Sequence, residues 1–118
     1  MVVDASVLAA WVFRERNAQD AHGLIQGQDL HAPRLLAYEL ANIARTKSLR
    51  DPQKAADIEA SLADAMAMDI HWHEVDHVAV LRLAMATGLS TYDASYLWLA
   101  RTLAVPLVTF DERLRTAR

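Results

Sequence analysis

The sequence predicts an α/β fold of three layers, in which a short, mainly parallel β-sheet is flanked by helices. Short runs of β-branched and apolar residues alternate along the chain with helical patterns, which is typical of parallel sheets. Two helical patterns follow each other without a strand between them, and they predict a protruding helical hairpin. Because 118 residues with 53% hydrophobic side chains fill one core, we expect a single domain over residues 1–118.

The first quarter of the chain is expected to hold two strands and two helices. Val2-Val3 is a β-branched pair that predicts the first strand, and a helix from Ser6 to Phe13 follows it. Asn17 is a suitable cap for a second helix that runs to about Gln26, before the helix-stopping Gly27. Residues 30–32 predict the second strand, which ends before a proline.

The helical hairpin is expected between residues 34 and 68. The first helix spans about Arg34 to Leu49, and Pro52 suits the first turn of the second helix, which runs to about Met68. Each helix carries one apolar stripe at helical spacing, as expected for helices that pack on one side. The stripe residues are Leu36, Leu40, Ile43 and Ala44 in the first helix and Ile58, Leu62, Ala65 and Met66 in the second.

The second half of the chain alternates strand and helix again. Apolar and polar residues alternate from 70 to 75, as in a half-buried strand, and a helix that Asp76 caps and Gly88 closes follows. Ser90 or Thr91 is the expected cap of the next helix, to about residue 103. Residues 105–109 predict a fourth strand, and a last helical turn begins at Asp111.

Composition and charge exclude several classes of protein. With no cysteine, the chain has no disulfide, no thiolate metal site and no cysteine nucleophile. We expect a cytoplasmic protein, because the first residues lack the basic charge of a signal peptide and no apolar run approaches the ~20 residues of a membrane span. The net charge of −3 disfavours binding to nucleic acid by charge alone, although a nuclease whose carboxylates hold cations would also have an acidic sequence.

Four acidic residues are predicted to meet at one edge of the sheet. Asp4 directly follows the first strand, and Asp111 closely follows the fourth. The carboxyl ends of parallel strands share one edge, where the sites of α/β proteins form. Asp93 lies in the first turn of a helix whose preceding loop reaches that edge. Glu39 lies in the middle of a helix between apolar neighbours.

Helix capping is the alternative interpretation of the three aspartates. An aspartate at a helix start bonds free N–H groups, and taken singly each of the three fits capping better than metal binding. Glu39 does not fit capping. Leu35 and Ile43, four residues away on either side, place it on an apolar face, where a carboxylate needs a partner. That partner is a metal ion in the prediction, and a base such as Arg45 in the alternative.

Clustered carboxylates repel one another, and divalent cations relieve that repulsion. Ligands that are all oxygen favour Mg²⁺ or Mn²⁺. The chemistry predicted is hydrolysis of a phosphodiester bond, with one metal to polarise the attacking water and a second to stabilise the departing oxygen. The sequence therefore predicts a catalytic metal site formed by Asp4, Glu39, Asp93 and Asp111.

Four short segments resemble motifs of the PIN-domain family, specifically its VapC-type toxins. They occur in the family's order and at its usual separations, and together they cover nearly the whole chain. Each motif is weak alone, whereas the ordered set is fairly specific. The segments are Val2-Val3-Asp4-Ala5-Ser6-Val7-Leu8, Glu39-Leu40-Ala41-Asn42, Ser90-Thr91-Tyr92-Asp93-Ala94 and Val108-Thr109-Phe110-Asp111-Glu112-Arg113-Leu114.

The resemblance implies a metal-dependent endoribonuclease, the toxin component of a toxin–antitoxin pair, in which the same four acids form the metal site. It also implies auxiliary roles near that site for Ser6, Asn42 and Thr109. The implied substrate is RNA, often transfer or ribosomal RNA, and the implied partners are an antitoxin and a second copy of the chain. The groove of the alanine-rich hairpin at residues 34–68 is the implied antitoxin site. Such toxins continue into a further helix and edge strand after the fourth motif, whereas this sequence stops at Arg118.

Three other groups of residues have ordinary interpretations. Exposed strand-end histidines fit His71, His73 and His77 better than a zinc site does. Clustered basic residues would either contact RNA phosphates or form a solvated face. Four aromatic residues are expected to pack in the core or in a dimer interface. The basic residues are Arg45, Lys47, Arg50, Lys54, Arg113, Arg115 and Arg118, and the aromatic residues are Trp11, Phe13, Tyr96 and Trp98.

The residues leave two alternative functions. A phosphatase would use Asp4 as a covalent nucleophile, but Ser6 stands where its second aspartate is expected and no suitable lysine follows the third strand. A catalytically silent module with this fold would bind only an antitoxin-like partner, and the presence of all four acids argues against it. Growth arrest that Asp4→Asn abolishes would separate the enzyme from the module.

Overall fold

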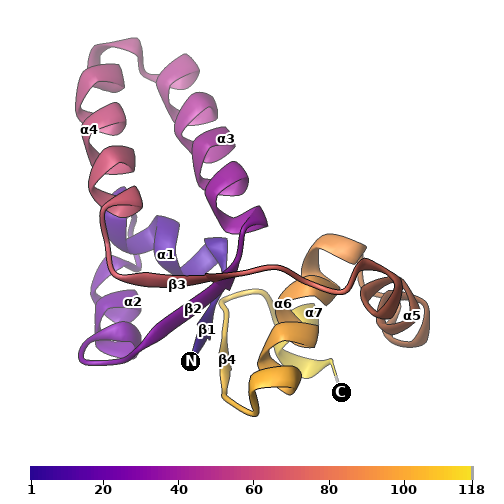
Figure 1. The fold of residues 1–118 in the computed structure, drawn as a ribbon. Helices are drawn as coiled ribbons and strands as arrows, with labels where there is room; N and C mark the ends of the chain where they lie inside the picture. The colour runs from indigo at the N-terminus through magenta and orange to yellow at the C-terminus, as the bar shows by residue number, and fades with distance from the viewer. Residues whose placement is uncertain (118) are drawn as a thin grey trace.

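The computed structural model describes residues 1–117 and contains one parallel β-sheet between helices (Figure 1). The strands lie in the order β3-β2-β1-β4, and each pairing between them is parallel. The central position of β1 suits a strand whose two valines are fully buried. This confirms the predicted sheet. The strands are β1 (Val2–Val3), β2 (Leu30–Pro33), β3 (Ile70–His73) and β4 (Leu107–Val108).

Helices cover both faces of the sheet, which gives the predicted three layers. In Figure 1, α1 and α2 lie on one side of the strands, and α6 lies on the other with α7 and α5 beyond it. The hairpin of α3 and α4 projects from the sheet, as predicted. The helices are α1 (Ala5–Val12), α2 (Ala18–Ile25), α3 (Leu35–Arg50), α4 (Ala55–Met66), α5 (His77–Thr87), α6 (Thr91–Leu103) and α7 (Glu112–Thr116).

Local signals in the sequence set most of the helix ends. The Asp76 carboxylate accepts a hydrogen bond from the Ala79 N–H at 3.1 Å and caps α5, and Gly88, with a φ of 77°, closes it in the left-handed conformation that glycine favours. Ser90, rather than Thr91, caps α6. Asn17 precedes α2 as predicted, but its side chain makes no capping hydrogen bond.

Three predicted boundaries are wrong. Pro52 opens a short 3₁₀ turn (Pro52–Lys54) rather than the first turn of α4. The third strand ends at His73, because β3 is an edge strand and β2, its partner within residues 1–117, ends opposite it at Pro33. Similarly, β4 is two residues long because it pairs with the two residues of β1.

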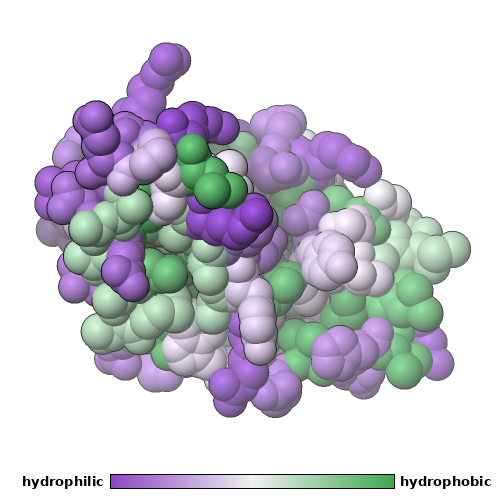
Figure 2. Space-filling view, turned by 90° about the horizontal axis from the view of Figure 1, so that it is seen from above, coloured by the Kyte–Doolittle hydropathy of each residue, from purple (hydrophilic) through white to green (hydrophobic). Residues whose placement is uncertain are grey.

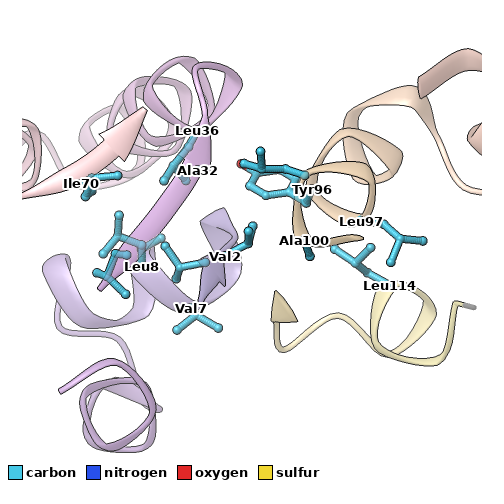
Figure 3. Packing of buried hydrophobic residues seen from close by; sticks show 14 of the residues in the cluster. Val2, Val7, Leu8, Ala32, Leu36, Ile70, Tyr96, Leu97, Ala100 and Leu114 are labelled. Carbon is cyan, nitrogen blue, oxygen red and sulfur yellow. The ribbon is translucent and has the colours of Figure 1, made fainter. Parts of the chain in front are cut away.

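The core is formed by side chains from the sheet and from the helices of both layers. Figure 3 shows Leu8 and Val7 of α1 beside Val2 of β1, with Tyr96 and Ala100 of α6 on the other side. Leu36 of α3 is fully buried in the same cluster, whereas Met66, predicted in the stripe of α4, is 39% exposed. The neighbouring Ala65 is fully buried, so α4 turns the face of Ala65 toward the core and leaves Met66 partly exposed.

The surface carries one helix with an apolar outer face. Val78, Leu81 and Met85 of α5 are more than half exposed, at the i, i+3 and i+7 spacing of one helix face. Figure 2 shows this part of the molecule as a group of hydrophobic side chains at the right of the view. Within residues 1–117, none of the helices combines the length and the apolar character that crossing a membrane requires.

We predict that Leu36→Ala lowers the free energy of unfolding by about 2–5 kcal/mol, because it removes a fully buried side chain and leaves a cavity. Urea denaturation followed by circular dichroism measures the change. Leu49→Ala is the matched control on the same helix, since Leu49 is 65% exposed, and its effect should stay within about 0.5 kcal/mol. Equal losses in the two variants would contradict the placement of the core.

Candidate active site

The pairing of β1 with β4 brings the first and last motifs of the chain together. Val3 lies opposite Val108 in the register, and the Asp4 N–H donates to the Val108 carbonyl oxygen at 3.3 Å. Asp4 therefore leaves the end of β1 beside the residues that follow β4, Thr109 and Asp111. This is the edge at which the sequence predicts them.

Asp4 is held by neutral donors on both carboxylate oxygens. The Thr109 hydroxyl donates to Oδ2 at 2.5 Å, and the Ser6 hydroxyl donates to Oδ1 at 2.7 Å. The N–H of Val7 also donates to Oδ1, at 3.3 Å. With 6% of its surface exposed, Asp4 is thus a buried carboxylate with a fixed orientation and no salt bridge among residues 1–117.

The same two hydroxyl groups also fix the backbone after β4. The Phe110 N–H donates to Ser6 Oγ, and the Asp111 N–H donates to Thr109 Oγ1, each at 2.9 Å. Each hydroxyl therefore donates to Asp4 and accepts from the loop that carries Asp111. Ser6 and Thr109 lie beside the acids, as the auxiliary role expected for them requires.

Glu39 reaches the site from α3 and meets a tyrosine from α6. The Tyr96 hydroxyl donates to Glu39 Oε1, while the tyrosine ring is buried in the core. From the sequence, Tyr96 is expected to pack in the core or in a dimer interface, and this bond is not predicted. Its position three residues after Asp93, and so on the same face of the helix, is the signal that could have found it.

Acidic neighbours contribute to a raised pKa in two of the four carboxylates, Glu39 and Asp93. Burial raises the pKa of Glu39, and the charges of Asp4 and Asp93 raise it further, against the hydrogen bond from Tyr96. Burial likewise raises the pKa of Asp93, with contributions from Asp111 and Asp4, and the charge of Arg113 opposes these. The charge of Asp4 thus reaches both Glu39 and Asp93, and the charge of Asp111 reaches Asp93, while a metal site shared by all four acids stays a prediction.

Burial also shifts the two groups that anchor this environment. It raises the pKa of Asp4, and the hydrogen bonds from Thr109 and Ser6 only partly offset it. Burial, followed by the charge of Glu39, raises the pKa of the Tyr96 hydroxyl far above its usual value. Tyr96 is therefore a neutral donor at any physiological pH.

Two of the candidate site's aspartates, Asp4 and Asp111, are also helix caps. Asp4 caps α1 through the Val7 N–H, and Asp111 caps α7 through the Leu114 N–H at 2.9 Å. The capping interpretation is thus correct for these two aspartates, although it does not explain why they lie side by side. Asp93 is not a cap, because Ser90 takes that position on α6.

The donor set is chemically suited to a hard divalent cation. Every candidate ligand is a carboxylate oxygen, and the mutual repulsion of the acids is the kind that Mg²⁺ or Mn²⁺ relieves. Within residues 1–117, no three acidic or histidine side chains already stand in an arrangement that would hold a metal ion. The side chains are instead oriented by their own hydrogen bonds, to Thr109 and Ser6 in the case of Asp4 and to Tyr96 in the case of Glu39.

The remaining residues singled out in the sequence lie around this centre or away from it. Asn42 is exposed on α3, three residues beyond Glu39, and no hydrogen bond in residues 1–117 joins its side chain to the acids. His71 and His73 do share a face of β3, where His73 Nε2 lies 2.8 Å from Nδ1 of His31 on β2. His77 instead opens α5.

Some of the basic residues lie near the acids and others lie away from them. Arg113 is held near Asp93 by a hydrogen bond to the Gly88 carbonyl oxygen at 3.0 Å, and Arg115 donates to the Thr109 carbonyl oxygen at 3.3 Å. Lys47 of the hairpin pairs with Glu15 at 2.8 Å, away from the acids. Arg118 lies outside the described residues.

Comparison with known proteins gives matches over nearly the whole chain. The model of the PIN domain matches residues 1–118. Ribonuclease VapC3 of Pyrobaculum aerophilum is 34% identical over 97% of this chain and 91% of that protein. Ribonuclease VapC9 of Mycobacterium tuberculosis is also 34% identical, over 97% of this chain and 87% of that protein.

The fold agrees with the sequence matches. The crystal structure of PAE2754 from Pyrobaculum aerophilum superposes with a TM-score of 0.77 at 27% identity, and it covers 96% of this chain and 75% of that one. The family model, the two relatives and the superposed fold therefore agree, and the chain belongs to the PIN-domain family.

Proposed function

We propose that this protein is a divalent-metal-dependent endoribonuclease and the toxin of a toxin–antitoxin pair. The observation that carries the proposal is the pairing of β1 with β4, which places Asp4 beside the loop that carries Asp111, while Glu39 and Asp93 lie near enough for the charge of Asp4 to raise the pKa of each. The relatives named VapC ribonucleases, at 34% identity, support the choice of RNA as substrate.

A bound divalent cation would supply Lewis acidity toward the scissile phosphate and its attacking water. Asp4, Glu39, Asp93 and Asp111 would hold it. Asp4 is the most rigid of these ligands, because Thr109 and Ser6 fix both of its oxygens. A carboxylate fixed in this way would hold a cation without reorganising during the reaction.

Asp93 is the acid we assign to proton transfer. Its carboxylate has no hydrogen bond within residues 1–117, and its raised pKa makes it a better proton acceptor than an ordinary aspartate. A proton taken from the attacking water would reside on an Asp93 oxygen and return to solvent. The nearby guanidinium of Arg113 would bind a phosphate oxygen of the RNA.

The antitoxin would dock beside the hairpin. A cavity of about 650 Å³ opens between the end of α1, the start of α2 and α4, and its lining includes the apolar side chains of Trp11, Val12 and Met68. An amphipathic partner helix would place its apolar face there. We also propose that two copies pair through the exposed apolar face of α5. A toxin that cuts transfer or ribosomal RNA would act in the cytoplasm.

We predict that Asp4→Asn, Glu39→Gln and Asp93→Asn each lower the rate of RNA cleavage by at least about a hundredfold, because each removes a ligand or a proton acceptor. The same substitutions should abolish growth arrest on expression. Cleavage of labelled RNA by the purified proteins in MgCl₂ measures the effect. Glu59→Gln, on the exposed side of α4, is the control and should cleave at the wild-type rate. Wild-type cleavage by the Glu39→Gln variant would exclude the proposed site.

We predict that Mg²⁺ raises the melting temperature of the wild-type protein, since a cation that binds only the folded state stabilises it. The gain would be about 2.7 kcal/mol when the concentration is a hundred times the Kd. Differential scanning calorimetry with MgCl₂ and with EDTA measures the shift. Asp4→Asn and Asp93→Asn should reduce it, whereas Glu59→Gln should retain it. An equal shift in all four proteins would place cation binding elsewhere.

We predict that Glu39→Gln becomes more stable relative to the wild type as the pH rises, in the absence of divalent cations. Burial raises the folded-state pKa of Glu39, so its contribution to stability is fully present below the ordinary value of 4.5 and is lost as the pH rises through the raised value. Glutamine has no such loss. Urea denaturation in EDTA at several pH values across this range measures the difference, and a constant difference would contradict the burial of the Glu39 charge.

A further inference from the structure

A second cavity, beside the acids, is not used by the proposed chemistry. It has a volume of about 340 Å³ and lies between the start of α3, the end of β3 and the first turns of α5 and α6. Its apolar walls come from Pro33, Leu35, Val75 and Val80, and the ring of Tyr92 lines it from α6. This volume lies in the range of sites that take small organic groups. We call this cavity the Tyr92 pocket.

The Tyr92 pocket lies one helical turn from the Tyr96–Glu39 hydrogen bond on both helices. Leu35 and Glu39 are four residues apart on α3, and so are Tyr92 and Tyr96 on α6. Residues at this spacing are neighbours on one helix face, with about 5–6 Å between their Cβ atoms. Asp93 also directly follows Tyr92. A polynucleotide whose phosphate lies at the acids would therefore have an adjacent nucleotide at the pocket.

The side chains of the pocket suit an aromatic ring with polar edges. Tyr92 is 64% exposed, so most of its ring is open to a stacking partner. His77 and Thr91 add an imidazole and a hydroxyl group, which can donate or accept hydrogen bonds at the edge of a bound ring. The Ser95 hydroxyl donates to the Tyr92 carbonyl oxygen at 2.6 Å, so it orients the first turn of α6 rather than the occupant.

The lining of the pocket also carries opposite charges. Arg34 and Glu74 line the cavity and form an ion pair with each other, with 64% and 75% of their side chains exposed. An exposed pair of this kind is weak, so it can open without a large loss of stability. An opened pair would leave the Arg34 guanidinium free to bind the phosphate that follows the bound base.

We infer that the Tyr92 pocket binds an unpaired nucleobase of the RNA, next to the phosphate that is cut, with the base stacked on Tyr92. This rests on the proposed ribonuclease function and adds to it the basis of sequence preference. Unpaired bases in loops can swing out of the RNA, stack on aromatic side chains and be read at their polar edges. The protein would thus cut a single-stranded segment and select the base that fills the pocket.

The test compares Tyr92→Ala, Tyr92→Phe and the wild type on short single-stranded oligoribonucleotides that carry A, C, G or U at each position flanking the scissile bond. For the base that the wild type prefers, Tyr92→Ala should lower kcat/KM about tenfold or more, and the preference should flatten. Tyr92→Phe keeps the ring and should keep the preference. Tyr38→Ala removes another exposed tyrosine, on α3 and outside the pocket, and should resemble the wild type.

The outcomes separate this inference from the function on which it rests. If the wild type cleaves none of the oligonucleotides, nor folded transfer or ribosomal RNA, the ribonuclease proposal fails. If it cleaves them and Tyr92→Ala keeps the same preference among the four bases, the base pocket is overturned. If the Tyr92→Ala protein differs from the wild type in oligomeric state, measured as the native mass in solution, and keeps its base preference, the pocket is an interface with a second copy or a partner chain. That outcome would also overturn the base pocket. Thermal melting of each variant verifies the fold.

Discussion

The structure depends on the parallel pairing of β1 with β4, two strands from opposite ends of the chain. Only two residue pairs form the ladder, Val2 with Leu107 and Val3 with Val108. The contact is nevertheless secured beyond the strands, because Ser6 and Thr109 connect Asp4 with the loop after β4. Without this pairing, Asp4 and Asp111 would have no reason to share an edge. The two shortest strands of the sheet therefore place Asp4 beside the residues that follow β4.

Removing a carboxylate from water works against folding, and the fold contains features that limit this effect for the buried Asp4 and the half-buried Glu39. Asp4 receives hydrogen bonds from two hydroxyl groups, and Glu39 receives one from Tyr96. Neutral donors stabilise a carboxylate without neutralising its charge. A lysine or arginine in their place would compete with a cation for the same oxygens. Under the proposed function, the neutral donors leave the charges of Asp4 and Glu39 available to a cation.

The order of the strands and helices could be predicted from the sequence because local signals mark most of the boundaries. Helix ends are marked by the caps Asp76 and Ser90 and by Gly88, which takes the left-handed conformation at the end of α5. The lengths of β3 and β4 could not be predicted, because each is limited by the length of its partner strand. The acids could be grouped because Asp4 and Asp111 follow strands. The spacing of Asp93 and Tyr96 places Tyr96 on the same helix face as an acid, but its bond to Glu39, 57 positions away, also depends on how two helices approach, which the sequence does not give.

Tyr96 links the interior of the protein to Glu39, an acid of the candidate site, through a single side chain. The residue is 1% exposed and packs in the core, while its hydroxyl group donates to Glu39. Under the proposed function, selection for a well-packed interior and selection for activity would act on the same residue. Substitution of Tyr96 is unfavourable in two ways. A smaller residue would leave a void in the core, and an apolar residue of equal size would leave the Glu39 carboxylate without its hydrogen-bond donor.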